Sequence, residues 1–93
     1  MQFEWHAAKA RSNEEKHGVS FDEAIAVFGD PLALTFQDVE HSGVESRYLT
    51  FGVCRGNRSL VVAHTSRGDK IRIISARTMT RRERRDYERH GQR

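Results

Sequence analysis

The sequence predicts an α+β fold with two N-terminal helices, a four-stranded antiparallel sheet and a C-terminal helix. Three observations predict it. Helix-forming residues with capping signals fill residues 7–30, four strand-like runs lie between residues 32 and 76, and a capped helical segment follows residue 79. The turns between the later runs are short, which favours antiparallel neighbours because parallel strands need long crossovers. A length of 93 residues fits one domain, residues 1–93.

Two helices are expected before the sheet. Residues 7–17 begin with helix-favouring alanines, and Gly18 stands where a left-handed C-terminal cap belongs. The second helix begins after Ser20, which forms a capping box with Glu23. Its apolar residues, spaced i, i+3, i+4 and i+7, are Phe21, Ala24, Ile25 and Phe28. Residues 29–31 (Gly-Asp-Pro) end this helix, and we expect both helices to cover one face of the sheet.

The sheet and the last helix follow. The expected strands, rich in β-branched and aromatic residues, are residues 32–37, 48–54, 60–65 and 71–76. Residues 55–58 and 67–69 have the length of hairpin turns, so the strands are expected to form a meander. Thr80 and Glu83 form a second capping box, which begins a helix that reaches about His90.

The positive charge of the chain lies on this closing segment. Residues 1–76 carry nine Lys or Arg against ten Asp or Glu, whereas residues 77–93 carry seven Arg against three acids, for a net charge of +3. This distribution favours a polyanion binder or a docking arm for an acidic partner, with a solvated Arg-rich helix as the alternative. Because the helix has little to bury besides Tyr87, we expect it to be mobile in the isolated chain and ordered by a partner.

Several classes of protein and site are not expected. The apolar runs are short and the N-terminus has no signal-peptide pattern, so we expect no membrane span and no export. A single cysteine, Cys54, cannot form an internal disulfide or a zinc cage and favours the cytoplasm. There is no His-Glu-x-x-His motif, and Asp38, Glu40 and His41 are expected in a loop. We therefore expect no metal and no cofactor.

Several blocks of the sequence carry a family resemblance. The N-terminal blocks are Phe3-Glu4-Trp5, Lys16-His17-Gly18-Val19-Ser20-Phe21 and Asp30-Pro31-Leu32-Ala33-Leu34. The C-terminal blocks are Arg47-Tyr48, Ile71-Arg72-Ile73-Ile74-Ser75-Ala76-Arg77, Arg82-Glu83-Arg84 and Tyr87-Glu88. In this order and separation they resemble the BrnT toxin family, and the resemblance covers nearly the whole chain.

This resemblance implies a bacterial ribonuclease toxin with a RelE-like fold, which cuts RNA without a metal and thereby stops translation. It also implies an antitoxin, BrnA, that neutralises the toxin and binds operator DNA. We expect a heterotetramer with two toxin chains, because closed twofold assemblies are the commonest. One departure is His6, where the family usually has Asp. A neutral imidazole is a poor N-cap, which puts the stability of the first helical turn in doubt.

Metal-independent RNA cleavage needs a base for the 2′-hydroxyl, an acid for the leaving 5′-oxygen and cations for the charge on phosphorus. Glu83 and Tyr87 stand at i and i+4 on one helix face. Arg72, Arg77 and Arg84 carry the planar fork that binds oxyanions in a bidentate manner. With the resemblance, Arg72, Arg77, Glu83 and Tyr87 are the candidate catalytic residues. Alternatively, Glu83 only caps the helix and Tyr87 only packs.

His64 is a further candidate for the catalytic base. If residues 67–69 form a three-residue turn, His64 lies directly across from Arg72, at a Cβ separation of about 4.5–5.5 Å. The neighbouring guanidinium would then keep the imidazole neutral. A two-residue turn would reverse the parity and separate the two residues, leaving His64 as the end of a buried strand.

A second group of basic residues is predicted to bind RNA. Lys9, Lys16 and His17 share one face of the first helix with Asn13, although a solvated face fits the pattern equally well. The basic residues of the last helix assigned to RNA binding are Arg81, Arg84 and Arg85.

The main alternative to an enzyme is a non-catalytic module that binds nucleic acid or protein. Such an inactive toxin homologue would act with the antitoxin in operon regulation. Net charge does not separate the two hypotheses, because both need phosphate contacts, whereas a cleavage assay does.

Overall fold

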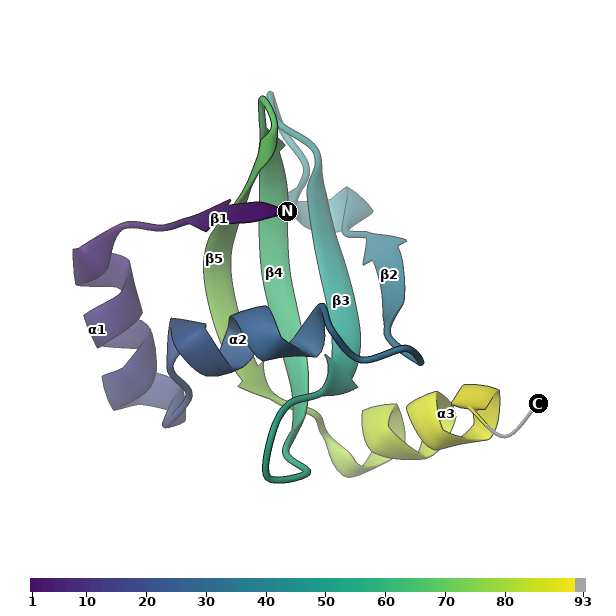
Figure 1. The fold of residues 1–93 in the computed structure, drawn as a ribbon. Helices are drawn as coiled ribbons and strands as arrows, with labels where there is room; N and C mark the ends of the chain where they lie inside the picture. Colours follow the sequence, from purple (N-terminus) through teal and green to yellow (C-terminus); the bar gives the residue numbers. More distant parts are fainter. Residues whose placement is uncertain (92–93) are drawn as a thin grey trace.

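The computed structural model describes residues 1–91 and confirms an α+β fold. Figure 1 shows α2 lying across one face of a twisted sheet, α1 beside β5, and α3 near the opposite end of the sheet from the β4–β5 turn. In chain order the elements are β1 (Gln2–Glu4), α1 (Ala7–His17), α2 (Phe21–Val27), β2 (Leu34–Gln37), the 3-10 helix η1 (Val39–His41), β3 (Arg47–Val53), β4 (Ser59–Arg67), β5 (Lys70–Thr78) and α3 (Arg81–Gly91). None of the helices within residues 1–91 is long and apolar enough to cross a membrane.

The prediction of a four-stranded antiparallel sheet is wrong in one respect. The sheet has five strands in the order β1-β5-β4-β3-β2, and β1 runs parallel to β5. The other four strands form the predicted antiparallel meander. The mixed sheet thus departs from the purely antiparallel arrangement predicted with the RelE-like fold. Three residues are too few for an alternation pattern, and the partner of Glu4 in β5, Arg72, lies 68 positions further along the chain.

Asn13 attaches α1 to the edge of β5. Because β1 pairs only with residues 70–72 of β5, the main chain at Ala76 lies beyond the reach of that strand. The Asn13 amide takes its place: Nδ2 donates to the carbonyl oxygen of Ala76 at 2.9 Å, and Oδ1 accepts from the Ala76 N–H at 3.1 Å. The same Nδ2 donates to the carbonyl oxygen of Val19. His6, at the N-cap of α1, makes no side-chain capping hydrogen bond within the described residues, in line with expectation.

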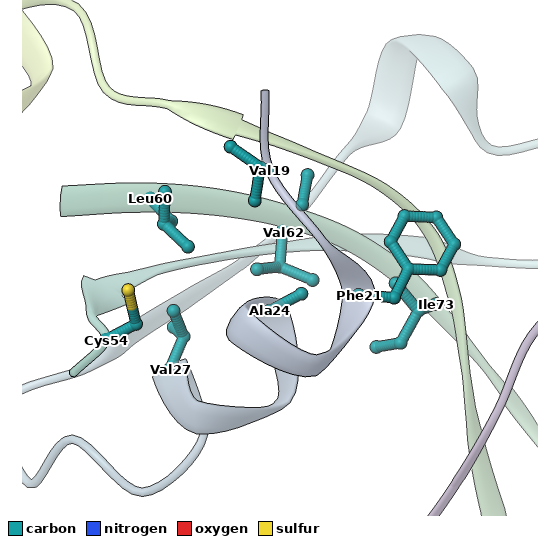
Figure 2. Close-up of a cluster of buried hydrophobic side chains, with 9 residues drawn as sticks. Val19, Phe21, Ala24, Val27, Cys54, Leu60, Val62 and Ile73 are labelled. Atoms are coloured by element: carbon teal, nitrogen blue, oxygen red, sulfur yellow. The ribbon is translucent and has the colours of Figure 1, made fainter. Parts of the chain in front are cut away.

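The core lies between α2 and the sheet (Figure 2). The predicted capping box at the start of α2 is confirmed, with Ser20 and Glu23 bonded to each other's backbone N–H. Gly52 of β3 permits close packing, since a Cβ there would meet Cγ1 of Val27 at 2.8 Å. The buried side chains of this cluster are Val19, Phe21, Ala24, Val27, Cys54, Leu60, Val62, Ile73 and Ala76. This close packing fixes α2 on one face of the sheet, and α2 does not cover the opposite face.

Two side-chain anchors hold α3. Its predicted capping box is confirmed, because the Thr80 N–H donates to Glu83 at 2.8 Å and the Glu83 N–H donates to Thr80 Oγ1 at 3.1 Å. Further along, the hydroxyl of Tyr87 donates to the carboxylate of Asp30, just before β2. Tyr87 is the only buried side chain among residues 81–90. The sequence of α3 therefore provides a defined start at Thr80 and Glu83, and Tyr87 attaches the helix to Asp30.

Candidate functional site

The face of the sheet that points away from α2, hereafter the open face, carries the candidate arginines. Leu60, Val62 and Ala76 point into the α2 core, so by alternation their neighbours along the strands point to the open face. Directly paired residues share a face. The pairing therefore forms three rows: Glu4, Arg72, Thr65 and Arg47; Ser75, Ala63, Leu49 and Phe36; Arg77, Val61, Phe51 and Leu34. Arg72 and Arg77 thus stand on one face with a mostly apolar strip between them.

Arg77 forms a bidentate ion pair with Glu83. Nη1 donates to Oε1 at 2.8 Å and Nη2 donates to Oε2 at 3.0 Å, which links β5 to the first turn of α3. The hydrogen bonds from Arg77 are the main cause that lowers the pKa of Glu83 to about 2. The same contact raises the pKa of Arg77. Glu83 is therefore fully ionised at neutral pH, and the guanidinium fork is occupied by a carboxylate.

Arg72 forms a second ion pair, with Glu4 of β1. Nε and Nη2 both reach Oε2, at 2.8 and 2.7 Å. The hydrogen bond from Arg72 lowers the pKa of Glu4. Sequence reasoning missed Glu4 as a partner because the contact depends on the β1–β5 pairing. The only available signal was its place in the Phe3-Glu4-Trp5 block.

Arg72 and Arg77 lie far apart along β5. Arg72 and Arg77 are five residues apart, which corresponds to roughly 15 Å along a strand. A β-bulge interrupts the β4–β5 pairing between them: Ala63 pairs with Ser75 and His64 pairs with Ile73, so Ile74 has no partner. Arg77 is turned to Glu83 of α3 and Arg72 to Glu4 of β1, so the two guanidinium groups do not converge on one point.

Tyr87 lies on the same helix face as Glu83, but its hydroxyl is bound elsewhere. The side chain is buried, and the hydroxyl donates to Asp30. Burial, with Asp30 as a second cause, raises the pKa of Tyr87. Asp30 also accepts from the backbone N–H groups of Leu32 and Val53, at 2.9 and 2.8 Å. Asp30, which sequence reasoning took only as part of a helix stop, is thus the anchor of α3.

The predicted position of His64 across from Arg72 is wrong. Arg67 pairs with Lys70, so Gly68 and Asp69 form a two-residue turn and Thr65 faces Arg72 instead. His64 pairs with Ile73 and points toward α2 rather than to the open face. The two residues therefore point to opposite faces of the sheet.

The surroundings of His64 are aromatic and closed. Its ring stacks on Tyr48 at 6.0 Å between centroids, and the Phe28 ring meets it edge-on at 5.0 Å. Nε2 lies 2.7 Å from Oγ1 of Thr50. Burial lowers the pKa of His64 to about 4, so the imidazole is neutral for a different reason than the predicted neighbouring arginine.

The residues predicted to bind RNA are exposed and belong to two separate elements. Lys9, Lys16 and His17 lie on α1, whereas the α3 residues are Arg81, Arg84 and Arg85. Asn13, on the same predicted face as the α1 residues, is buried against β5. Among residues 1–91, no group of three or more His, Cys, Asp or Glu side chains is placed to hold a metal ion.

A comparison with known protein families agrees with the blocks in the sequence. A family described as "Ribonuclease toxin, BrnT, of type II toxin-antitoxin system" matches residues 5–83. The match includes Arg72 and Arg77 and ends at Glu83. No curated protein matches the chain.

Proposed function

The chain belongs to the BrnT family of ribonuclease toxins of type II toxin–antitoxin systems, and from this we propose that it is a metal-independent endoribonuclease that inhibits translation. In the proposed reaction the 2′-hydroxyl of RNA loses its proton and its oxygen bonds to the adjacent phosphorus. The bond from phosphorus to the 5′-oxygen breaks, and that oxygen takes up a proton. The products are a 2′,3′-cyclic phosphate and a free 5′-hydroxyl.

The observation that carries this proposal is the Arg77–Glu83 pair on the open face. A guanidinium fork binds a phosphate with the same two parallel hydrogen bonds with which it binds a carboxylate. An incoming phosphodiester therefore competes with Glu83 for Arg77. Once the phosphate holds Arg77, Glu83 loses the largest influence that depresses its pKa and becomes a stronger proton acceptor.

The capping contacts keep Glu83 in place during this exchange. Its Oε1 accepts the backbone N–H of Thr80, so the carboxylate stays at the start of α3 when Arg77 turns to the substrate. We assign Glu83 to accept the 2′-hydroxyl proton and Arg77 to stabilise the charge that develops on phosphorus. Arg72, roughly 15 Å from Arg77 along β5, binds a different phosphate of the RNA, and Tyr87 positions α3 through Asp30.

A type II system also implies a protein antitoxin and an RNA target. We propose that the partner is a BrnA-like antitoxin, which binds the operator DNA and assembles with two toxin chains in the cytoplasm. The exposed arginines of α3, with Lys9, Lys16 and His17 of α1, extend the RNA-binding surface.

Cleavage by the purified chain in EDTA tests this function. We expect RNA fragments with 2′,3′-cyclic phosphate ends. Arg77→Ala and Glu83→Gln are each expected to slow cleavage by about 100-fold or more, because each removes a group that acts in the transition state. Arg55→Ala, at an exposed turn, is the control and should cleave at the wild-type rate. Thermal melting of each variant separates loss of catalysis from loss of folding.

The second candidate, a non-catalytic module, is favoured by one observation. The two candidate arginines of the open face, Arg72 and Arg77, are already bound to carboxylates, as in ion pairs that serve only the fold. RNA left uncut in the assay, together with Glu83→Gln being no less toxic than wild type in growing cells, would favour this candidate.

A further inference from the structure

We propose that the free edge of β2 and the hollow between β2 and α3 bind an extended segment of the antitoxin, which adds a strand to the sheet. This inference rests on the proposed function, because it takes the occupant to be the protein partner of a type II toxin. Strand addition uses main-chain hydrogen bonds for affinity and side-chain pockets for specificity, and both are available here.

The main chain of β2 is arranged to pair on its outer side. β2 is the last strand of the sheet, so nothing within the described residues pairs with its outer edge. The Asp38 N–H donates to the carbonyl oxygen of Arg47, with which it lies in register. Hydrogen-bonded pairs alternate along an antiparallel ladder, so the N–H and C=O groups of Thr35 and Gln37 point away from β3.

This edge lacks the usual protection against pairing. Natural edge strands carry charges, prolines or bulges that discourage other chains from pairing with them. The sequence of β2, Leu-Thr-Phe-Gln, has none of these residues. Large apolar side chains stand exposed in and around the strand: Leu32 (51%), Phe36 (52%), Val39 (75%) and Val44 (108%). An unprotected edge beside exposed apolar side chains is typical of a surface that a partner covers.

A hollow of about 380 Å³ lies beside this edge. Its lining residues are Leu34, Phe36, Phe51, Glu83, Asp86, Tyr87, Arg89 and His90. Phe36 and Phe51 meet edge-to-face at 5.9 Å and form the apolar side. A hollow of this size accepts one large apolar side chain from a strand paired with β2.

The hollow is lined by charges of both signs, which favours a protein segment over the uniformly negative backbone of RNA. The α3 helix carries five arginines against three carboxylates, and Arg89 lines the hollow. However, Glu83 and Asp86 also line the hollow and oppose a phosphate backbone inside it. The free main-chain N–H and C=O groups of β2 likewise suit the ladder of hydrogen bonds that an added peptide strand makes. A docked segment lies against Glu83, so the same contact that holds the antitoxin also closes the proposed catalytic site.

Gln37→Pro tests the proposal directly. Proline removes the outward N–H and its ring blocks the approaching strand, while the bonds to β3, made by Leu34, Phe36 and Asp38, remain. Gln37→Ala keeps the N–H and is the matched control. The probe is the antitoxin encoded beside the toxin gene, titrated into a cleavage assay with each purified variant. We expect Gln37→Pro to need at least about tenfold more antitoxin for half inhibition than Gln37→Ala.

The outcomes separate this inference from the proposed function. Equal inhibition of both variants, with free chains that cleave RNA and melt like wild type, overturns docking at the β2 edge and leaves the enzyme intact. No cleavage by the free wild-type chain overturns the proposed function instead; antitoxin affinity measured by calorimetry then still tests the edge. If Phe36→Ser lowers cleavage by the free chain and antitoxin inhibition is unchanged, the hollow takes a nucleobase and the proposal fails.

Discussion

Burial determines the protonation state of the imidazole of His64. The ring lies between Tyr48 and Phe28, and its pKa in the folded chain is about 4, against 6.5 for a free histidine. Between these two values the unfolded chain binds the proton and the folded chain does not. Stability contributed by the neutral ring is therefore complete above pH 6.5 and is lost as the pH falls toward 4.

This loss of stability at low pH can be measured. From pH 7 to pH 5 the free energy of unfolding should fall by about 2 kcal/mol through His64. The free energy of unfolding of His64→Leu should fall by about 2 kcal/mol less than that of the wild type over this pH range. In this variant Thr50 loses His64 but keeps Thr35 as a hydrogen-bond partner, at 2.8 Å. Urea denaturation at both pH values measures the difference, with His6→Leu as control, because His6 is exposed and makes no capping hydrogen bond. The same acid loss in His64→Leu as in wild type would contradict the prediction. RNA cleavage by His64→Leu should stay near normal, because the ring points toward α2.

At the scale of the element, two side chains on one face of α3 bind it to the rest of the fold. Glu83 binds Arg77, and Tyr87 binds Asp30. Glu83 and Tyr87 are four positions apart and therefore lie on one face of the helix. Among residues 81–90 no side chain other than that of Tyr87 is buried. Most of the stability of a helix this short comes from tertiary packing, so α3 depends on these two anchors. That α3 is mobile in the isolated chain and ordered by a partner stays a prediction.

Tyr87→Phe tests the second anchor without removing the ring. Loss of the hydrogen bond to Asp30 should raise the amide exchange rates of α3 by about tenfold, while β4 and β5 exchange as in wild type. Arg82→Ala, on the exposed side of α3, is the control. Hydrogen exchange followed by mass spectrometry measures both. Exchange in α3 of the isolated wild-type chain that is slower than in the sheet would contradict this description of the helix.

At the scale of the whole molecule, charge and apolar surface are both unevenly distributed. The positive excess lies on residues 77–93, and the exposed apolar side chains Leu32, Phe36, Val39 and Val44 gather around β2. A partner that covers both regions occludes the proposed catalytic face. This fits the proposed antitoxin, and an antitoxin that pairs by twofold symmetry would bring two toxin chains together.

We therefore expect the chain, coexpressed with its neighbouring antitoxin, to purify as an assembly with two toxin chains. Light scattering during gel filtration measures the mass of the complex. A complex with one chain of each kind would contradict the expected stoichiometry, although it would leave the identity of the partner unchanged.

Local signals in the sequence predicted most of the elements. The capping boxes of Ser20 with Glu23 and of Thr80 with Glu83 are complete within four residues, and both formed as predicted. Alternation in residues 32–37, and β-branched and aromatic residues bounded by turns in the other three runs, likewise located the four strands of the meander to within a few residues. These features depend on interactions between close neighbours in the chain, so the sequence alone determined them.

Only the tertiary structure decided which side chains meet. The turn has two residues, Gly68 and Asp69, and not three, and this difference of one residue places His64 on the opposite face of the sheet from Arg72. The contacts of Asn13 with Ala76, and of Asp30 with Tyr87, join residues 63 and 57 positions apart. Such contacts depend on strand register and on the packing of α1 and α3, and side-chain direction in a strand reverses with a shift of one residue. A pattern read along the chain carries no information on that shift.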